Sequence, residues 1–347
     1  MPGAYTHLRI ARAAQCAAHL NVPCQSAFEM GANGPDPMFV AYVLPKRADY
    51  SLPELAARLH TQQCGAFLIA LLQTAKTPAQ RSYALGFLTH YAADTTMHPY
   101  VTALCVPGGV FDRPSGHGFC EAALDTFFHT ADTGVPAVPV DDAAPALQKR
   151  ELAEVCALLR RALRLVYHTE VCALDLADMF HVFRAAHRFA CSPHGGKKLA
   201  ARAVDAVLHR KGCTLCYMTP CRAPEQGFPF HWQRAETAKA VAEGTAESET
   251  IHAGPHALCM QAVKLGLSYF KAANGLWQNT ITPAQCWRVL GSNSYHTGLP
   301  CAAPVAPVAP VVPVAPVVPV APVVSVAPVV SVAPAVPSVP AATGTTK

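Results

Sequence analysis

The sequence predicts an all-α fold of several helices, followed by a Pro-rich tail. Ala, Leu and Arg dominate the segments before residue 300, and alternation of β-branched residues is rare. In two of these segments, histidines and carboxylates recur at every fourth position, which places them on one face of a helix. From Cys301 onward the chain instead repeats Ala, Pro and Val. We therefore expect a helical domain at 1–297 and a low-complexity tail at 298–347.

The spacing of apolar residues outlines the expected helices. They lie at 5–20, 53–74, 79–98, 116–130, 149–168, 172–190, 196–210, 232–243, 255–272 and 283–290. Pro53 lies where the first turn of a helix tolerates proline, and Pro99 is expected to end the third helix at His98. Gly and Pro cluster at 31–37, 106–109, 135–139 and 217–229, which are expected loops. Nothing in the pattern indicates a parallel sheet.

The chain carries few charges. Charged residues make up 14% of it, against roughly 25% in an ordinary soluble domain. The net charge is +5, and no run of Lys and Arg stands out; Lys197 and Lys198 form an isolated pair. A nucleic-acid partner held through phosphate contacts is therefore not expected. Sixteen histidines are conspicuous beside so few charges.

The tail differs from the rest of the chain in its prolines. Eleven of the 31 prolines lie in residues 301–347, at about every third position. Proline lacks the N–H donor and fixes φ, so this segment cannot be helical, and we expect an extended or disordered spacer. The longest apolar run elsewhere, 66–72, is far shorter than the ~20 residues of a membrane-spanning helix.

The N-terminal residues show no apolar stretch behind basic residues, so no secretory signal is visible and a cytoplasmic location is expected. Export by another route stays open. The fourteen cysteines are expected to be reduced thiols. Cys213, Cys216 and Cys221 form a CxxCx4C motif, but no fourth ligand follows at a convincing spacing, so a zinc knuckle is not favoured.

The first group of metal-ligating residues is His90, Asp94 and His98, spaced four apart. On a helix, each step of four residues turns ~400°, so the three lie on one stripe with about 40° of drift per step. Eight residues rise about 12 Å, whereas a Zn–N bond is about 2.0–2.1 Å. His90 and His98 are therefore too far apart to share one ion on a straight helix. The pattern predicts two metal ions, with Asp94 between them and able to bridge through its two oxygens.

The second group is His117, Glu121 and Asp125, again four apart. His and a carboxylate at positions i and i+4 share a helix face and can chelate one ion. Asp125 is expected either to extend the site or to orient a ligand from behind. Both groups lie among apolar residues, where unpaired charges are costly to bury, and this favours a metal site over ordinary surface histidines.

The order His, Asp, His, His-x3-Asp, His, His-x3-Glu resembles the ligand order of the bacterial zinc-dependent phospholipase C family. The matching motifs are Ala4-Tyr5-Thr6-His7, Gly34-Pro35-Asp36, Leu59-His60, His90-x3-Asp94-x3-His98-Pro99 and His117-x3-Glu121-x3-Asp125. The resemblance covers residues 1–130 and is weaker to about residue 295, where Trp232 is the candidate for a family Trp. It implies a helical domain that holds up to three zinc ions.

The resemblance also implies how the ligands divide between the ions. One ion would be held by Asp36, His60, His90 and Asp94, and a second by His98, His117 and Glu121. Asp94 would bridge to a third ion, together with His7 and the N-terminal amine. Family members present a mature N-terminal Trp, whereas this chain begins Met1-Pro2-Gly3. The expected cofactor is therefore two or three zinc ions.

Such a cluster suits the hydrolysis of phosphodiesters. The resemblance implies that water attacks the phosphorus of a phospholipid or a related phosphodiester, with Asp36 orienting the water while it touches zinc. Peripheral contact with a membrane is compatible with that substrate. Several aromatic residues near the ligands could pack around it, although membership of the core is the favoured interpretation for each. They are Tyr5, Phe39, Tyr91, Phe111 and Phe119.

Two other functions stay open at this point. The chain could be a zinc phosphodiesterase, nuclease-like in fold, that acts on a soluble substrate. It could also be a non-catalytic homologue that binds metal or lipid. His168, His181, His187 and His194 have no carboxylate at ligand spacing, so they are expected to be structural or exposed.

Overall fold

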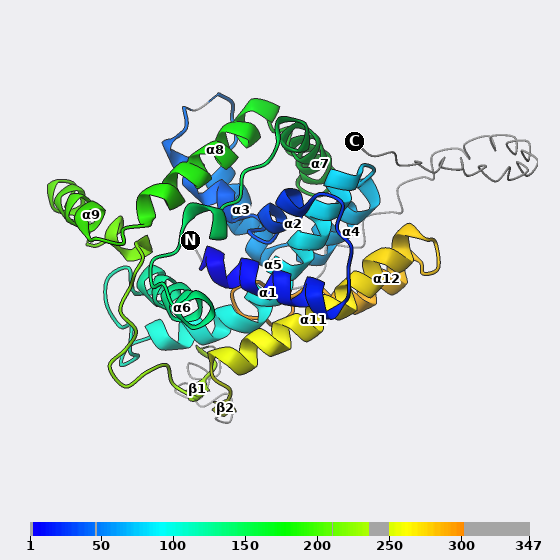
Figure 1. Cartoon of the computed structure of the whole chain (residues 1–347). Helices are drawn as coiled ribbons and strands as arrows, with labels where there is room; N and C mark the ends of the chain where they lie inside the picture. Colours follow the sequence, from blue (N-terminus) through cyan, green and yellow to red (C-terminus); the bar gives the residue numbers. More distant parts are fainter. Residues whose placement is uncertain (1–2, 46, 210, 236–249, 302–347) are drawn as a thin grey trace, which may run out of the picture. The chain divides into compact units, whose positions relative to one another are not determined.

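Helix α5 (Pro78–Cys105) runs through the middle of the fold, with α1 (Ala4–Ala17), α2 (Gln25–Gly31) and α11 (Pro255–Trp277) packed against it (Figure 1). The structure is a computed structural model that describes residues 3–45, 47–209, 211–235 and 250–301. All of these residues belong to one compact unit. The predicted all-α class is confirmed, because helices make up almost all of the regular structure described.

The other elements surround this centre. The α-helices are α3 (Leu52–Thr61), α4 (Cys64–Thr74), α6 (Gly116–Thr133), α7 (Lys149–Tyr167), α8 (Ala173–Ala190), α9 (Gly196–Val207) and α12 (Pro283–Leu290). Short 3-10 helices are η1 (Asp36–Val43), η2 (Val140–Asp142) and η3 (Leu215–Tyr217). Strands β1 (His231–Gln233) and β2 (Thr250–His252) form an antiparallel pair, with His231 opposite His252.

A capping box fixes the start of α5. The Thr77 hydroxyl accepts a hydrogen bond from the Gln80 N–H at 3.2 Å, and the Gln80 side chain accepts one from the Thr77 N–H at 3.3 Å. Pro78 follows at the first helical position, where its missing N–H costs nothing. The register of the buried ligand face of α5 is thereby set from its first turn.

Glycines allow α2 and α5 to touch through their backbones. A Cβ atom at Gly86 would lie 1.9 Å from the Phe28 carbonyl oxygen, and one at Gly31 would lie 2.2 Å from the Tyr83 carbonyl oxygen. No other residue type fits so close an approach. The contact brings the turn after α2, which precedes Asp36, onto the helix that carries His90.

Several predicted boundaries are wrong. The helix expected at 53–74 is broken into α3 and α4, because Gln63 takes a left-handed conformation with φ 54°. Helix α5 does not end at His98 but continues through Pro99 to Cys105. Gly298, with φ 67°, packs closely against the Thr95 carbonyl, the group that Pro99 leaves without its helical donor.

Other differences concern short elements. Helix α2 was not expected, and part of the expected loop at 31–37 begins the 3-10 helix η1. The helix expected at 232–243 is wrong at its start, where β1 pairs with β2 instead; residues 236–243 lie outside the described part of the chain. The predicted tail at 298–347 lies outside it from residue 302 onward and stays a prediction. Within the described residues, no helix combines the length and apolar character needed to cross a bilayer.

Candidate metal centre

The predicted stripe on α5 is the floor of a buried polar cluster. His90, Asp94 and His98 expose 0%, 1% and 4% of their surface. Asp94 is the central member: its Oδ2 lies 2.9 Å from His90 Nε2, and its Oδ1 lies 3.5 Å from His98 Nδ1. The two carboxylate oxygens therefore face in different directions along the helix, as expected for a bridging ligand.

One group of ligand atoms gathers at the His90 end of the stripe. His60, near the end of α3, places its Nε2 3.6 Å from Asp94 Oδ2 and 3.4 Å from Asp36 Oδ1. Ligand atoms of His60, His90 and Asp94 all lie within 4.8 Å of one another. Asp36, at the start of η1, is 1% exposed and closes this group from the other side.

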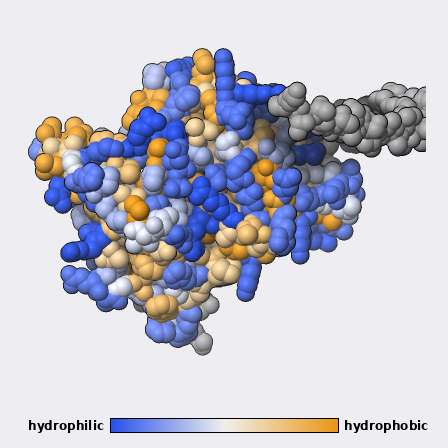
Figure 2. Space-filling view, in the orientation of Figure 1, coloured by the Kyte–Doolittle hydropathy of each residue, from blue (hydrophilic) through white to orange (hydrophobic). Residues whose placement is uncertain are grey.

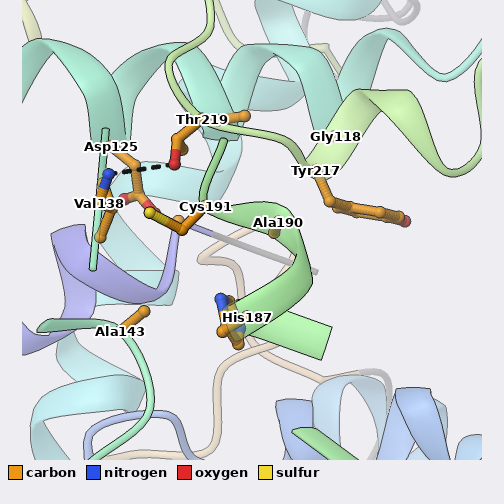
Figure 3. A pocket seen from close by; sticks show the side chains of 11 residues that line it. Gly118, Asp125, Val138, Ala143, His187, Ala190, Cys191, Tyr217 and Thr219 are labelled. Carbon is orange, nitrogen blue, oxygen red and sulfur yellow. Dashed lines mark hydrogen bonds between the residues drawn. The ribbon is translucent and has the colours of Figure 1, made fainter. Parts of the chain in front are cut away.

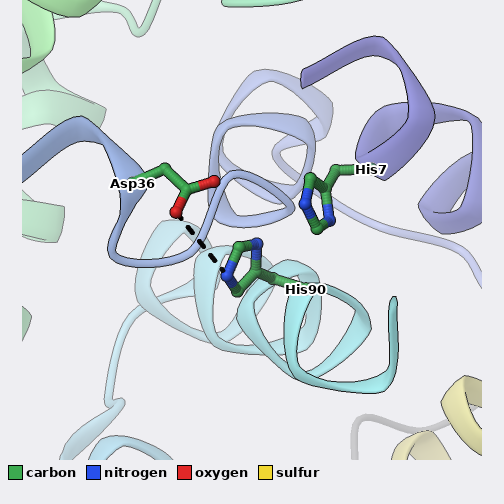
Figure 4. A group of neighbouring side chains, drawn as sticks. All are labelled: His7, Asp36 and His90. Carbon is green, nitrogen blue, oxygen red and sulfur yellow. Dashed lines mark ion pairs between the residues drawn. The ribbon is translucent and has the colours of Figure 1, made fainter. Parts of the chain in front are cut away.

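His7 joins the same region from α1. Its Nε2 lies 3.2 Å from Asp94 Oδ1, and its ring stacks on that of His90 at 4.4 Å between centroids. Figure 4 shows His7 and Asp36 on either side of His90, whose Nε2 lies 4.0 Å from Asp36 Oδ1. Ligand atoms of these three residues form a second overlapping group within 4.8 Å. His7 is thus close to Asp94, as the resemblance implied, and also to Asp36.

The third group lies at the other end of the stripe. Glu121 Oε1 is 3.1 Å from His98 Nε2 and 2.8 Å from His117 Nε2. His117 and Glu121 are neighbours on α6, whereas His98 reaches across from α5. His117 is the exposed edge of the group, with 44% of its side chain accessible. All eight predicted ligands therefore come together in one continuous cluster.

The separations within the cluster fit zinc. Ligand atoms at about 2.0–2.1 Å from a tetrahedral ion are about 3.3 Å from one another. The nitrogen–oxygen distances in the three groups run from 2.8 to 4.0 Å. Several buried polar atoms of the ligand residues also have no hydrogen-bond partner, which is costly unless something else satisfies them. These atoms are His7 Nδ1, Asp36 Oδ1, His90 Nε2, Asp94 Oδ2 and Glu121 Oε2.

Backbone carbonyls orient the imidazoles. The Nδ1 atoms of His60, His90 and His98 lie 2.7, 3.2 and 3.2 Å from the carbonyl oxygens of Ala56, Ala32 and Tyr295. A ring that donates from Nδ1 keeps the lone pair of Nε2 free for a metal. The donor set of imidazole nitrogens and carboxylate oxygens is one that zinc prefers.

In the first two groups, burial and the neighbouring charged residues shift the pKa values of the histidines and of Asp94. Burial disfavours the protonated form of His7, but the carboxylate of Asp94 outweighs burial and raises the pKa of His7 to about 9. Burial is likewise outweighed at His60, whose pKa is raised by Asp36 and Asp94. At His90, burial prevails and lowers the pKa. Burial opposes ionisation of Asp94, yet the surrounding imidazoles hold its pKa well below the usual range.

The third group follows the same rule. The charge of Glu121 raises the pKa of His117 against the effect of burial. Although burial opposes it, contact with His117 and His98 lowers the pKa of Glu121 below its usual range. Carboxylates thus stay ionised in a buried site, and a divalent cation would neutralise them in the way that protons on the histidines do otherwise.

Asp125 stands behind the cluster and orients α1. It accepts hydrogen bonds from the Thr6 N–H at 2.8 Å, the Thr6 hydroxyl at 2.7 Å and the Tyr5 N–H at 3.1 Å. These donors belong to the first turn of α1, directly before His7. Of the two roles left open by the sequence, the structure favours the orienting one.

Sequence reasoning missed the cover of the site. Tyr295 is fully buried, and the ring of His296 stacks at 5.1 Å on His60 and at 5.5 Å on His98. Both residues follow α12 in an irregular segment, so no helical periodicity points to them. Burial lowers the pKa of His296 to about 4, which keeps its imidazole neutral at physiological pH.

The aromatic candidates divide into two kinds. Tyr5, Tyr91 and Phe111 are buried core residues, as the favoured interpretation held. Phe39 is partly exposed and lies 5.2 Å from the ring of His60, so it is the aromatic residue best placed to meet a substrate. Phe119 is also partly exposed, but the Arg113 guanidinium covers its ring at 3.9 Å from the ring centroid.

A pocket lies beside the ligand face of α6. It is small and partly open to solvent, and Gly3, Gly118, Asp125 and Tyr217 are among its lining residues. Figure 3 shows His187 on its wall. His187 was expected to be structural or exposed; it is a partly buried side chain whose Nε2 has no partner, and burial lowers its pKa to about 4.

The cysteine motif shows no sign of binding metal. Cys213 is exposed, the Cys216 thiol donates to the Cys213 carbonyl at 3.4 Å, and the Cys221 thiol donates to the Phe119 carbonyl at 3.5 Å. Among the described residues, the groups that could hold a metal contain only histidines and carboxylates.

Buried histidines and carboxylates gathered around a shared aspartate on an all-α scaffold define a candidate multi-metal centre. A family model for zinc-dependent phospholipase C matches residues 6–163, the part of the chain that supplies all eight ligand candidates. This match confirms, for residues 6–163, the resemblance to the zinc-dependent phospholipase C family that the sequence motifs indicated. No curated protein and no solved structure matches the chain.

Proposed function

We propose that the chain is a zinc-dependent hydrolase of phospholipase C type, which cleaves a phospholipid or a related phosphodiester. The observation that carries the proposal is the position of Asp94, whose Oδ2 lies 2.9 Å from His90 Nε2 and whose Oδ1 lies 3.2 Å from His7 Nε2, so that it stands between two groups of ligand atoms. A shared carboxylate holds two ions close together, and two close ions suit the displacement at phosphorus. When bound, zinc supplies Lewis acidity toward the phosphoryl oxygens and lowers the pKa of water.

The number of ions follows from charge. Asp36, Asp94 and Glu121 bring three negative charges into a buried site, and a protein interior tolerates them only when they are compensated. Two divalent ions nearly balance them when the imidazoles are neutral. We propose two zinc ions as the core of the centre, at His60–His90–Asp94 and at His98–His117–Glu121. His7, whose Nε2 faces Asp94 Oδ1, is the additional ligand available to a third ion, which would share Asp94 with the first.

Asp36 has the role of the residue that orients water. Its carboxylate is buried, its Oδ1 has no hydrogen-bond partner, and it lies beside His60 rather than on the bridging axis. It can accept a proton or a hydrogen bond from a water directed at phosphorus. The leaving group would be the diacylglycerol oxygen, and the second product would be the phosphorylated head group.

The test is zinc content followed by activity on two substrates. Metal-replete protein is analysed by elemental mass spectrometry, then assayed on a monomeric short-chain phosphatidylcholine and on a soluble chromogenic phosphodiester. About two zinc ions per chain, with release of phosphocholine, support the proposal. Cleavage of the soluble ester alone favours the phosphodiesterase alternative, and bound zinc without either activity favours the non-catalytic one. The cytoplasmic location expected from the sequence is a separate proposal, tested by cell fractionation.

A further inference from the structure

Helix α9 turns its apolar side outward. Leu199, Val204 and Val207 expose 70%, 43% and 76% of their surface, and Leu208 just beyond the helix exposes 53%. Ala200, Ala203 and Ala206 are exposed beside them. At 100° per residue, the aliphatic side chains of α9 from Ala206 round to Val204 form one continuous stripe, and the one other helical position within it, Gly196, carries no side chain. Figure 2 shows the corresponding hydrophobic patch where Figure 1 places α9.

The inner side of α9 carries the polar anchor. Ala201 and Asp205 are its buried residues. The Asp205 carboxylate accepts hydrogen bonds from the Thr214 N–H at 2.9 Å and from the Leu215 N–H at 3.0 Å. These bonds fix the helix to η3 and determine which side faces out. The arrangement is the reverse of an ordinary surface helix, in which the apolar side faces the core.

Basic residues border the apolar stripe. On the helical wheel, Lys197 adjoins Val204 at one edge and Arg202 adjoins Ala206 at the other. The surrounding segment 188–211 contains Arg188, Lys197, Lys198, Arg202, Arg210 and Lys211. Its single acidic residue is Asp205, which is buried against η3. These basic residues are spread out along the sequence, so they do not form a continuous run of Lys and Arg.

We infer that α9 docks the protein on a bilayer surface that carries anionic head groups. An aliphatic stripe with cations at both edges fits the boundary between acyl chains and head groups, because the stripe enters the apolar layer while the cations meet the phosphates. A second copy of the chain fits less well, because a twofold contact through this stripe would bring the basic edges of two helices together. The inference rests on the proposed function only in its choice of a lipid partner.

The location of α9 is suited to an enzyme that acts on lipid. Helix α9 packs on η3, and η3 packs on α6. The contact with α6 is close, because a Cβ atom at Gly118 of α6 would be 2.7 Å from the Cys216 sulfur and 3.0 Å from the Tyr217 ring. The residue before Gly118 is His117, the exposed edge of the metal centre. Docking through α9 would therefore bring the bilayer to the side on which the ligand cluster is accessible.

The test is flotation of the full chain with lipid vesicles. One set is phosphatidylcholine, and the other contains about one third phosphatidylserine. Leu199→Gln/Val207→Gln removes two aliphatic side chains from the stripe while keeping helix-forming residues. Met260→Gln/Val289→Gln is the matched control, because these residues are similarly exposed on α11 and α12. Lipid phosphorus is measured before and after flotation, so that hydrolysis of the lipid is distinguished from binding to the vesicles.

We expect wild type and the control to bind the anionic vesicles, and the α9 variant to bind at least about tenfold more weakly. Arg202→Gln should weaken binding to anionic vesicles about fivefold and leave neutral vesicles unaffected. Equal binding by wild type and the α9 variant would overturn the inference, as would absence of vesicle binding by wild type. If sedimentation showed that wild type is a dimer and the α9 variant a monomer, the inference would be wrong, and the occupant of the stripe would be a second copy of the chain.

Zinc content, melting temperature and the rate on the soluble phosphodiester separate this inference from the proposed function. We expect all three to be unchanged in the α9 variant, because none of its altered residues touches the metal centre. A zinc-loaded chain that cleaves no ester but still binds vesicles through α9 would contradict the proposed function and leave the docking inference supported.

Discussion

His98 and Tyr295 are 197 residues apart in the sequence, yet Nδ1 of His98 lies 3.2 Å from the backbone carbonyl oxygen of Tyr295. The bond orients the imidazole so that its Nε2 faces Glu121. The Tyr295 N–H donates in turn to the His60 carbonyl at 2.8 Å. The segment after α12 therefore holds two ligands in place, although it lies outside the part that matches the family.

This contact predicts different results for two truncations. A chain ending at residue 301 keeps Tyr295 and His296 and should retain its full zinc content. A chain ending at Leu290 loses the carbonyl that orients His98 and the cover over His60, so we expect zinc affinity to fall about 10- to 100-fold. Competition with a calibrated chelator measures both. Equal affinity in the two chains would show that this segment does not support the centre.

Asp94→Asn should remove metal and activity together. The amide that replaces the bridging carboxylate lacks a negative charge and offers one oxygen acceptor where two ligand groups need one each. We expect loss of at least one zinc ion per chain and a rate reduced by about a thousandfold or more. Asp141→Asn is the control, because Asp141 is exposed and forms an ion pair with Arg184 away from the ligand cluster. Normal zinc content and turnover in Asp94→Asn would exclude the shared-ligand arrangement.

The ligands and their helices could be predicted because they follow helical spacing. His90, Asp94 and His98 lie four apart, and their shared face follows from the geometry of any α-helix. The cover could not be predicted in the same way, since Tyr295 and His296 belong to an irregular segment whose place depends on tertiary contacts. The prediction from Pro99 was wrong because α5 continues through this residue, with Gly298 packed against the Thr95 carbonyl, and this long-range contact is not visible in any local pattern.

The outward apolar face of α9 is a similar case. Its periodicity predicted a helix correctly, but periodicity identifies an apolar stripe without showing which side meets the core. The usual expectation is that the stripe is buried. Here the hydrogen bonds of Asp205 to η3 decide the orientation, and they join residues of different elements.

Zinc affinity should rise with pH. Zinc needs the neutral imidazole of His7, whose pKa of about 9 means that binding at pH 7 displaces a proton. If His7 is a ligand, each pH unit between about 6.5 and 9 should increase the affinity of its site up to tenfold. The measurement is chelator competition at pH 6.5, 7.5 and 8.5. An affinity that does not change over this range would exclude His7 as a ligand.

The metal-free chain should show the opposite trend in stability. A raised folded-state pKa means that protonated His7 stabilises the fold below its unfolded pKa of about 6.5, and this contribution is lost as the pH rises through about 9. His60 and His117, whose pKa values are also raised, act in the same direction. We expect the free energy of unfolding of the metal-free chain to fall over this range, measured by urea denaturation, and that of the zinc-loaded chain to hold or rise.

Asp125→Asn should weaken zinc binding without removing a ligand. The carboxylate accepts three hydrogen bonds from the first turn of α1, and an amide has only one oxygen to accept them. In either orientation of the amide, its NH2 group would also face an N–H donor, that of Tyr5 or that of Thr6. We expect a destabilisation of about 1–3 kcal/mol and a loss of affinity confined to the site that uses His7. The remaining sites should keep their zinc, which elemental analysis after chelator washing would show.

Gly86→Ala tests whether the contact between α2 and α5 supports the centre. A Cβ atom there would lie 1.9 Å from the Phe28 carbonyl oxygen and 2.9 Å from the Ala32 nitrogen, so two backbones must separate. Overpacking of this kind typically costs about 1–3 kcal/mol, and the lower melting temperature is measurable by calorimetry. Moving Ala32 also displaces the carbonyl that orients His90, so zinc affinity should fall with stability.

Gly196→Ala is the matched control for that variant. Nothing lies within 4 Å of a Cβ atom at Gly196, the first residue of α9, so the added methyl group meets no obstacle there. Its melting temperature should be unchanged or higher, and its zinc affinity unchanged. If Gly86→Ala lowered the melting temperature but left zinc affinity at the control value, then Ala32 would not be the group that positions His90, and the ligand would be held by α5 alone.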